Sequence, residues 1–366
     1  MADILTWRDD HDAAEIIQRT ATAVLEGAVV AVPTETGYVA AGSVLAPTAV
    51  ARLAAGTDEP LTLAVPTVGH ALDWVWDMST LGRRLARRCW PGPMTLVFAN
   101  GVGEGLLSRL PTAVRRHLCP DSKLYLTSPE QVILASLLRF LPAPMVLARR
   151  AAAPGETPSS LEMVLQACGA DIALAIDAGP PVYDQPNTVV AVNGTSWRMV
   201  SEGVLSTEEV AQQTVCLVVF VCTGNTCRSP MAEALCKMLL ARRLQCTIEE
   251  LPQRGFLVLS AGMAAAVGDQ AAPEAAAAVQ ELGAELTGHA SRPLAGELAA
   301  QADFLITMTR GHGEAVRARF PHVAPPRLLC PDGHDIADPI GGDADVYRAC
   351  AQQLLRHIEQ LVAELQ

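Results

Sequence analysis

One short segment constrains the fold of this 366-residue chain more than any other. An apolar run, Cys216–Cys222, is followed by small and polar residues and then by Ser229-Pro230. The run has the length and the β-branched content of a buried strand. A proline fits the first turn of a helix, where its missing N–H has no partner to lose. The segment therefore predicts a strand, a tight loop and a helix in succession, an arrangement that points backbone N–H groups at one anion.

The side chains of this loop suit phosphate chemistry. Gly224 and Asn225 permit a tight turn, and the planar guanidinium of Arg228 can clamp two phosphate oxygens. The positive environment favours the thiolate of Cys222, and a thiolate inside a phosphate cradle is a phosphoryl acceptor. Ser229 can hydrogen-bond that thiolate. We interpret Cys222 as a candidate nucleophile, against the alternative of a buried strand-end cysteine with an unrelated surface arginine.

The spacing between cysteine and arginine carries little information by itself. Cys236 and Arg242 show the same spacing inside a predicted helix. The strand, the loop and the helix start around Cys222 distinguish the two pairs. Cys227 has two interpretations: it forms a reversible disulfide with Cys222, or it is a packed thiol.

A route through a cysteinyl phosphate also needs a proton donor for the leaving group. Asp338 precedes Pro339 in a segment with the composition of a loop, ahead of the last predicted helix. Gly341-Gly342 leaves room there for a substrate. An Asp-Pro pair is by itself most often a turn, so these residues alone leave the catalytic and the structural interpretation open.

The two halves of the chain differ in their patterns, which predicts two α/β domains, residues 1–213 and 214–366. In the first domain short β-rich runs alternate with helical patterns, which is typical of a mixed sheet. The expected helices there are Ala13–Gly27 and Ser206–Thr214, and the expected strands are Ala28–Pro33, Leu61–Pro66, Met94–Phe98, Pro144–Leu147 and Thr188–Val192.

The second domain shows a regular series of strands, loops and helices. The expected strands are Cys216–Val221, Phe256–Ser260 and Phe304–Met308, and the expected helices are Pro230–Arg243, Ala272–Leu282, Gly313–Arg319 and Asp345–Leu365. This alternation predicts a parallel sheet with helices on both faces. A ligand of such a sheet binds beyond the carboxyl ends of the strands, where the loop after Cys222 falls.

Charge and cysteine content limit the partners and the compartment. The chain has 39 acidic and 27 basic residues and no Lys/Arg block, which argues against a generic binder of nucleic acid or anionic membrane. Its apolar runs fall short of the roughly 20 residues of a membrane span, and its acidic start lacks a secretory pattern. Ten dispersed cysteines without a zinc-type pairing favour reduced thiols in the cytoplasm.

We expect neither metal nor cofactor at the loop after Cys222. Arg228 and backbone N–H groups there supply the positive charge that Mg²⁺ supplies in other phosphoryl-transfer sites.

Residues 216–366 resemble the low-molecular-weight protein tyrosine phosphatase family over their full length. The matching segments are Cys222–Pro230, Ser260-Ala261-Gly262, Ala302-Asp303, Thr307-Met308-Thr309 and Asp338-Pro339. The resemblance implies a phosphorylated protein substrate, with Cys222 as nucleophile, Arg228 as phosphate binder and Asp338 as general acid. It also implies Ser229 as the partner of the thiolate and Asn225 as the brace of the loop. The remaining positions of the phosphate site are Thr223, Gly224, Thr226 and Cys227.

Within that family the chain leans toward the bacterial protein-arginine phosphatases. Those enzymes carry threonine where tyrosine-specific members have a larger aliphatic residue, and Thr226 occupies that position. Their sequences also contain a segment similar to Asp338-Pro339-x-Gly-Gly of this chain. Ile340 stands where tyrosine-specific members have aromatic residues, and it differs from the phenylalanine common in the arginine subgroup. Phosphoarginine and phosphotyrosine are both left open as substrates.

Residues 10–212 resemble the YrdC-like threonylcarbamoyl-AMP synthase family. The matching segments are Pro33–Tyr38, Trp90–Val97, Asn187–Val190 and Ser201-Glu202-Gly203. On composition alone the first two are rigid turns at the rim of a sheet. The resemblance implies a twisted α/β sheet with a large positive cavity. It also implies an enzyme that combines threonine, bicarbonate and ATP for tRNA modification. Some members of the family bind double-stranded RNA.

This half departs from that family where the phosphates of ATP bind. The family's Lys-x-Arg falls on Ala54–Pro60, which contains no cation but holds Asp58 and Glu59. The family's Ser-x-Asn falls on Ala148-Arg149-Arg150, and we interpret these two arginines as a surface pair rather than an anion site. In addition, Val39 stands where the family has a glycine after the tyrosine. We predict a degenerate homologue without synthase activity, kept as a binding or regulatory module with RNA or a nucleotide as its ligand. The alternative is a bifunctional tRNA-modification protein with a working L-threonylcarbamoyladenylate synthase in this half.

Overall fold

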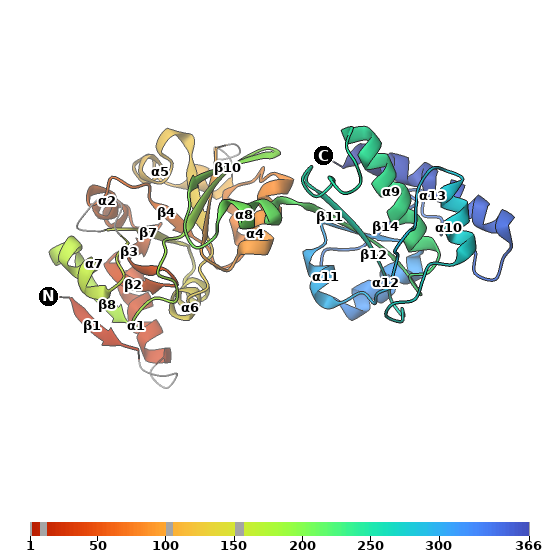
Figure 1. Ribbon diagram of the computed structural model, residues 1–366. Helices are drawn as coiled ribbons and strands as arrows, with labels where there is room; N and C mark the ends of the chain where they lie inside the picture. Colours follow the sequence, from red (N-terminus) through yellow and green to blue (C-terminus); the bar gives the residue numbers. More distant parts are fainter. Residues whose placement is uncertain (1, 8–12, 100–104, 151–156, 366) are drawn as a thin grey trace. The chain divides into compact units, whose positions relative to one another are not determined.

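The computed structural model describes residues 2–7, 13–99, 105–150 and 157–365 (Figure 1). The chain separates into two compact units, Met1–Gln213 and Thr214–Gln366, called here the N-terminal and the C-terminal unit. Each unit has its own sheet and its own hydrophobic core. No helix in the described part of the chain combines the length and the apolar character that a membrane crossing requires.

The N-terminal unit is built on one mixed sheet, which has ten strands in the described residues and the order β1-β8-β2-β3-β7-β4-β6-β5-β9-β10. The strands are β1 (Asp3–Thr6), β2 (Val29–Thr34), β3 (Gly37–Ser43), β4 (Thr62–Ala64), β5 (Met94–Phe98), β6 (Leu124–Thr127), β7 (Met145–Ala148), β8 (Ile172–Asp177), β9 (Thr188–Asn193) and β10 (Ser196–Ser201). β2 is parallel to β8 and antiparallel to β3, so the sheet is mixed, as the sequence predicted.

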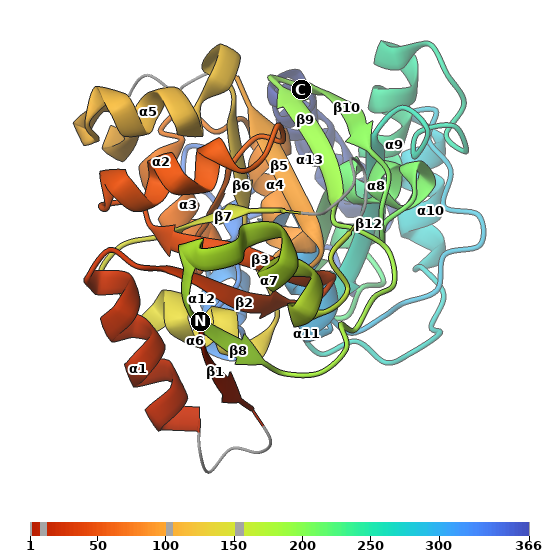
Figure 2. The same ribbon diagram turned by 90° about the vertical axis from the view of Figure 1, so that its left-hand side faces the viewer.

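Helices cover both faces of this sheet. They are α1 (Ala13–Leu25), α2 (Pro47–Ala55), α3 (Val68–Trp74), α4 (Thr80–Cys89), α5 (Thr112–Leu118), α6 (Val132–Phe140), α7 (Leu161–Cys168) and α8 (Thr207–Thr214). Alternate residues of β2 enter two separate clusters: Val30 and Val32 belong to one with residues of α1 and α6, whereas Val29 and Ala31 belong to another with residues of α2 to α5 and α7. Figure 2 shows α1 and α6 together beside β2 and β8. Such alternation is what a strand buried on both faces requires.

The C-terminal unit is a four-stranded parallel sheet in the described residues, with the order β12-β11-β13-β14. Its strands are β11 (Cys216–Cys222), β12 (Phe256–Gly262), β13 (Phe304–Thr307) and β14 (Arg327–Leu328). Its helices are α9 (Arg228–Leu244), α10 (Pro273–Gln280), α11 (Gly296–Gln301), α12 (Arg310–Arg319) and α13 (Ala344–Glu364). Val218 and Phe220 of β11 pack with α9, α10 and α13, while Val219 and Val221 pack with α11 and α12. The predicted parallel sheet with helices on both faces is confirmed.

The structure also differs from the sequence prediction at particular elements. α9 begins at Arg228, two residues before the predicted start, because Pro230 lies in the first turn of the helix, where a proline removes no hydrogen bond. β1, β3, β6, β8 and β10 were not predicted in the first half, nor α11 and β14 in the second. β3 reads Gly-Tyr-Val-Ala-Ala-Gly-Ser, and its small residues have little strand propensity of their own. Burial between β2 and β7 makes it a strand.

Candidate active site and a second cavity

The anion cradle (residues 222–229) lies where β11 ends and α9 begins. Cys222 is the last residue of β11 and only 3% exposed, and its Sγ lies 2.9 Å from the Oγ of Ser229. The backbone N–H of Asn225 donates to the same sulfur at 3.2 Å. The sulfur is therefore surrounded by hydrogen-bond donors at the positive end of a helix, which is the environment that an anion requires.

Asn225 holds the cradle in shape. Its backbone is left-handed, with a φ of 57°, and its side chain is fully buried. Its Nδ2 donates to the Oγ of Ser229 at 3.0 Å and to that of Ser260 at 2.8 Å, and its Oδ1 accepts from the backbone N–H of Arg292 at 2.9 Å. An amide nitrogen only donates, so the hydroxyl of Ser229 accepts from Asn225 and keeps its own proton. The sulfur at 2.9 Å is the nearest acceptor for that proton.

Arg228 and Asp338 form an ion pair over the cradle. Arg228 is the first residue of α9 and is 5% exposed. One of its terminal nitrogens contacts the carboxylate of Asp338, and the other donates to the carbonyl of Ile336 at 3.3 Å. Asp338 belongs to the loop between β14 and α13, and its side chain is 44% exposed. An anion that binds Arg228 competes with this carboxylate for the N–H donors of the guanidinium.

The other residues of the loop differ in their exposure. Thr223 is exposed, Gly224 and Thr226 are half-buried, and Cys227 is buried. The Sγ of Cys227 lies 3.4 Å from the hydroxyl of Tyr347 on α13. In this structure Cys227 is therefore a packed thiol, and both Cys222 and Cys227 are free.

Three side chains that contact the cradle were missed in the sequence analysis. The ring of His289 lies 2.8 Å from the carbonyl of Asn225, the ring of His312 lies 2.9 Å from the Oγ1 of Thr223, and Tyr347 contacts Cys227. These partners are 64, 89 and 120 residues apart in the chain. Neither periodicity nor local spacing relates positions so distant, so only the fold reveals them.

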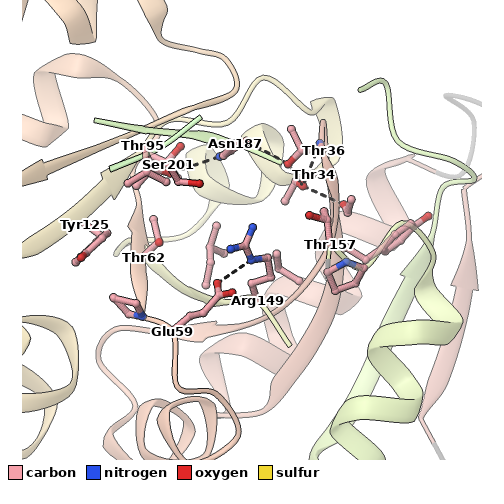
Figure 3. Close-up of a pocket in the computed structure, with 18 of the residues that line it drawn as sticks. Thr34, Thr36, Glu59, Thr62, Thr95, Tyr125, Arg149, Thr157, Asn187 and Ser201 are labelled. Carbon is pink, nitrogen blue, oxygen red and sulfur yellow. Dashed lines mark hydrogen bonds and ion pairs between the residues drawn. The ribbon is translucent and has the colours of Figure 1, made fainter. Parts of the chain in front are cut away.

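The N-terminal unit contains a separate cavity of about 270 Å³ (Figure 3). Hydroxyl and amide groups line much of it: Thr34, Thr36, Thr62, Thr95, Tyr125, Thr127, Thr157, Asn187 and Ser201. Thr36 donates to Asn187 at 3.1 Å, and Asn187 donates to Thr95 at 3.5 Å, so part of this lining is already fixed by internal hydrogen bonds. The segments that suggested rigid turns, Pro33–Tyr38 and Trp90–Val97, contribute to this wall.

One ion pair supplies the charges among the described residues of the cavity wall. Among the described residues that line it, Glu59 and Arg149 are charged, and the Nε of Arg149 lies 2.7 Å from the Glu59 carboxylate. Arg150 is not the surface residue that the sequence suggested. It is 5% exposed and donates to the carbonyls of Arg52 and Leu53 at the end of α2, where helix carbonyls lack partners within the helix.

Comparisons with known proteins agree with this division of the chain. Residues 217–366 match the family described as low molecular weight phosphotyrosine protein phosphatase. A protein-arginine-phosphatase of Geobacillus stearothermophilus is 39% identical over 155 residues, which cover 41% of this chain and 95% of the relative. The chain belongs to the low molecular weight phosphotyrosine protein phosphatase family. Its C-terminal unit is therefore a low-molecular-weight protein phosphatase, and we call it the phosphatase unit.

The N-terminal unit carries a Sua5/YrdC domain. Residues 22–203 match the family of Sua5, YciO and YrdC proteins, described as telomere recombination. A Mycobacterium tuberculosis protein provisionally named threonylcarbamoyl-AMP synthase is 26% identical over 216 residues, 58% of this chain and 95% of that protein. A solved Sua5 structure from P. abyssi has a TM-score of 0.51 at 18% identity, with 71% of this chain and 91% of that chain covered. The likeness to that structure shows the fold of the unit.

Proposed function

We propose that the phosphatase unit removes phosphate from protein side chains through a cysteinyl-phosphate intermediate. The thiolate of Cys222 attacks phosphorus while Arg228 and the backbone N–H groups of the cradle hold the phosphoryl oxygens. The bond from phosphorus to the substrate side chain breaks, and Asp338 in its acid form gives a proton to the leaving atom. Ser229 donates to the sulfur and stabilises it as a leaving group in the second step.

The second step regenerates the enzyme. Asp338, now a carboxylate, takes a proton from a water molecule, and the water oxygen attacks phosphorus. The sulfur–phosphorus bond breaks, which releases inorganic phosphate and the Cys222 thiolate. The observation that carries this proposal is the meeting of three groups at one cradle: a sulfur with hydrogen-bond donors around it, a buried guanidinium, and an accessible carboxylate that touches the guanidinium.

We further propose phosphoarginine as the preferred substrate. Thr226 is small, half-buried and part of the cradle, and a hydroxyl-bearing side chain there suits a guanidinium better than an aryl ring. Ile340, beside Asp338, is 70% exposed and offers no aromatic surface on which a phenyl ring could stack. Two relatives with 39% and 36% identity are named protein-arginine-phosphatases, which supports the same preference.

Parallel kinetics on a phosphoarginine and a phosphotyrosine peptide with the full chain test this preference. We expect a higher kcat/KM on phosphoarginine. Thr226→Ile should lower that value and raise the value on phosphotyrosine, a crossover of about 1–3 kcal/mol, which is the scale of one pocket contact. If Thr226→Ile changes both substrates by the same factor, Thr226 does not determine the preference.

For the N-terminal unit we propose ligand binding without synthase activity. A triphosphate needs several cations, whereas the cavity offers Arg149, already paired with Glu59, and Arg150 is buried at the end of α2. The rival hypothesis, a working threonylcarbamoyl-AMP synthase, predicts release of pyrophosphate that depends on threonine and bicarbonate. We expect no such release from the full chain, and a clear threonine-dependent rate would establish the rival function.

A further inference from the structure

A hydrogen-bonded chain of three side chains leads from α12 to the mouth of the cradle. The Oγ1 of Thr309 caps α12 by accepting from the backbone N–H of His312 at 3.2 Å, and it also lies 2.9 Å from the Nδ1 of His312. The Nε2 of the same ring lies 2.9 Å from the Oγ1 of Thr223. Thr223 directly follows Cys222 and is exposed, whereas Cys222 is buried, so of these two side chains that of Thr223 is the one that a substrate side chain in solvent can reach.

The surroundings of His312 keep its ring neutral at neutral pH. The residue is 9% exposed, and Arg228 of α9 and two carboxylates of the loop before α13, Asp335 and Asp338, face it. Burial, and then the positive charge of Arg228, lower the pKa of His312 below its ordinary value, and the two carboxylates only partly oppose this. A neutral imidazole has one N–H and one bare nitrogen.

The two tautomers of this ring give the Thr223 hydroxyl different hydrogen-bonding roles: it accepts from the ring in one and donates to the ring in the other. When Nε2 carries the proton, Thr223 accepts from His312 with one of its two lone pairs, and its own hydroxyl proton no longer has the ring as its acceptor. When Nδ1 carries the proton, Thr309 accepts from it, Nε2 accepts the Thr223 proton, and the lone pairs of Oγ1 face the mouth. A guanidinium presents only N–H donors, so it selects the second tautomer. The ring of a phenyl phosphate has no N–H and gains nothing from this acceptor.

We propose that Thr223 is a specificity-determining residue that accepts a hydrogen bond from the guanidinium of phosphoarginine, and that His312 is the positioning residue that holds its hydroxyl in the accepting orientation. This inference rests on the proposed phosphoarginine substrate. Asp338 is partly exposed and also faces His312, so the leaving guanidinium would meet both a proton donor and an acceptor.

The test measures kcat/KM of the full chain on a phosphoarginine and a phosphotyrosine peptide. Thr223→Val keeps the shape of the side chain but removes the acceptor, and it should lower the phosphoarginine value at least about tenfold more than the phosphotyrosine value, the scale of one hydrogen bond to a charged group. Thr223→Ser should restore most of the loss. The matched control is Thr287→Val, an exposed threonine outside the cradle, which should change neither substrate.

His312→Asn tests the positioning role, with the exposed His322→Asn as its control. It should reproduce the selective loss of Thr223→Val, and the two losses should not add in the double variant, since they act through one hydroxyl. Retained turnover of phosphotyrosine shows that each variant is folded. Equal losses on both substrates would overturn this inference and leave the proposed function intact. Absence of phosphoarginine turnover in the wild type would overturn both.

The pH profile gives a second readout that a merely structural role would not change. Protonated His312 donates from both nitrogens, so Nε2 no longer accepts the Thr223 proton, and that proton turns toward the guanidinium. The ratio of phosphoarginine to phosphotyrosine kcat/KM should therefore fall as the pH falls through the lowered pKa of His312, below about pH 6.5. In Thr223→Val the pH dependence of this ratio should contain only the ionisation of the two substrates, so it should be less steep than in wild type. An equally steep dependence in that variant would contradict the proposal.

Discussion

Both units place an arginine against a carboxylate, but the two pairs stand in different surroundings. Arg228 is buried at the first turn of α9, beside the backbone donors that surround Cys222, and its partner Asp338 is on a loop. Arg149 follows β7, its side chain is about one-third exposed, and its partner Glu59 shares the wall of the cavity. An ion pair alone is therefore no evidence for an anion site. The backbone donors and the helix terminus make the difference.

The largest effect on turnover is expected when the nucleophile of the cradle is removed. Cys222→Ser replaces the sulfur with a hydroxyl that stays protonated at neutral pH, so turnover should fall roughly 10⁴-fold or more. Binding of inorganic phosphate, measured by calorimetry, should persist, because Arg228 and the backbone donors are unchanged. Activity within tenfold of wild type would exclude Cys222 as nucleophile.

Cys236→Ser is the matched control for this substitution. Cys236 lies on α9, shows the same spacing to an arginine, and is fully buried, which raises its pKa and keeps it a thiol. Turnover should stay within about twofold of wild type. A complete loss would show that the wrong pair of cysteine and arginine had been chosen.

Asp338→Asn tests the ion pair of the cradle, because Asp338 is proposed to act as the general acid and it also contacts Arg228. Loss of the general acid should lower kcat about 10²–10⁴-fold on phosphoarginine and much less on p-nitrophenyl phosphate, whose leaving group needs no proton. Loss of the carboxylate that touches Arg228 should at the same time tighten inhibition by phosphate. Asp332→Asn, an exposed residue of the same loop, should do neither. A loss of equal size on both substrates would indicate a structural role for Asp338.

Much of the cradle could be predicted from the sequence because its parts are contiguous. The strand, the loop and the start of α9 follow one another within residues 216–230, so burial, turn chemistry and helix-start signals all apply to one segment. The positions of Cys222, Arg228 and Asn225 follow from that local order. Asp338 had no local signal for catalysis, and only the family resemblance suggested it.

What the sequence did not predict depends on contacts between distant segments. His312 reaches Thr223 only because β13 lies next to β11 in the sheet and α12 follows β13. β3 consists mostly of small residues with little strand propensity, and it is a strand because its neighbours in the sheet pair with it. Arg150 looks like a surface residue in the sequence, yet the end of α2 lies where its guanidinium can donate to two carbonyls. Local patterns contain none of this information.

A smaller effect is expected at Gly262, the last residue of β12. A Cβ built on it would lie 2.5 Å from the carbonyl oxygen of Thr223 and 3.0 Å from the backbone nitrogen of Asn225, so the cradle has to shift. Gly262→Ala should lower kcat/KM about tenfold to a hundredfold, through misplacement of the donors around phosphate. Gly296→Ala is the control, because its Cβ would make only ordinary contacts with Phe320. Normal kinetics of Gly262→Ala would mean that the cradle tolerates displacement.

The smallest effect is expected in the cavity of the N-terminal unit, where it tests the second of the two ion pairs, Arg149 with Glu59. Glu59→Gln removes the carboxylate beside Arg149 and leaves that guanidinium free to bind an anion. The pair is partly exposed and contributes about 0.2–1 kcal/mol, so affinity for AMP, measured by calorimetry on the full chain, should rise no more than about fivefold. Asp58→Asn, exposed and outside the lining, should leave AMP binding unchanged. If Glu59→Gln instead bound AMP a hundredfold more tightly, Glu59 would be the feature that closes a complete anion site, and the contrast between the two units would lie in one residue rather than in their backbones.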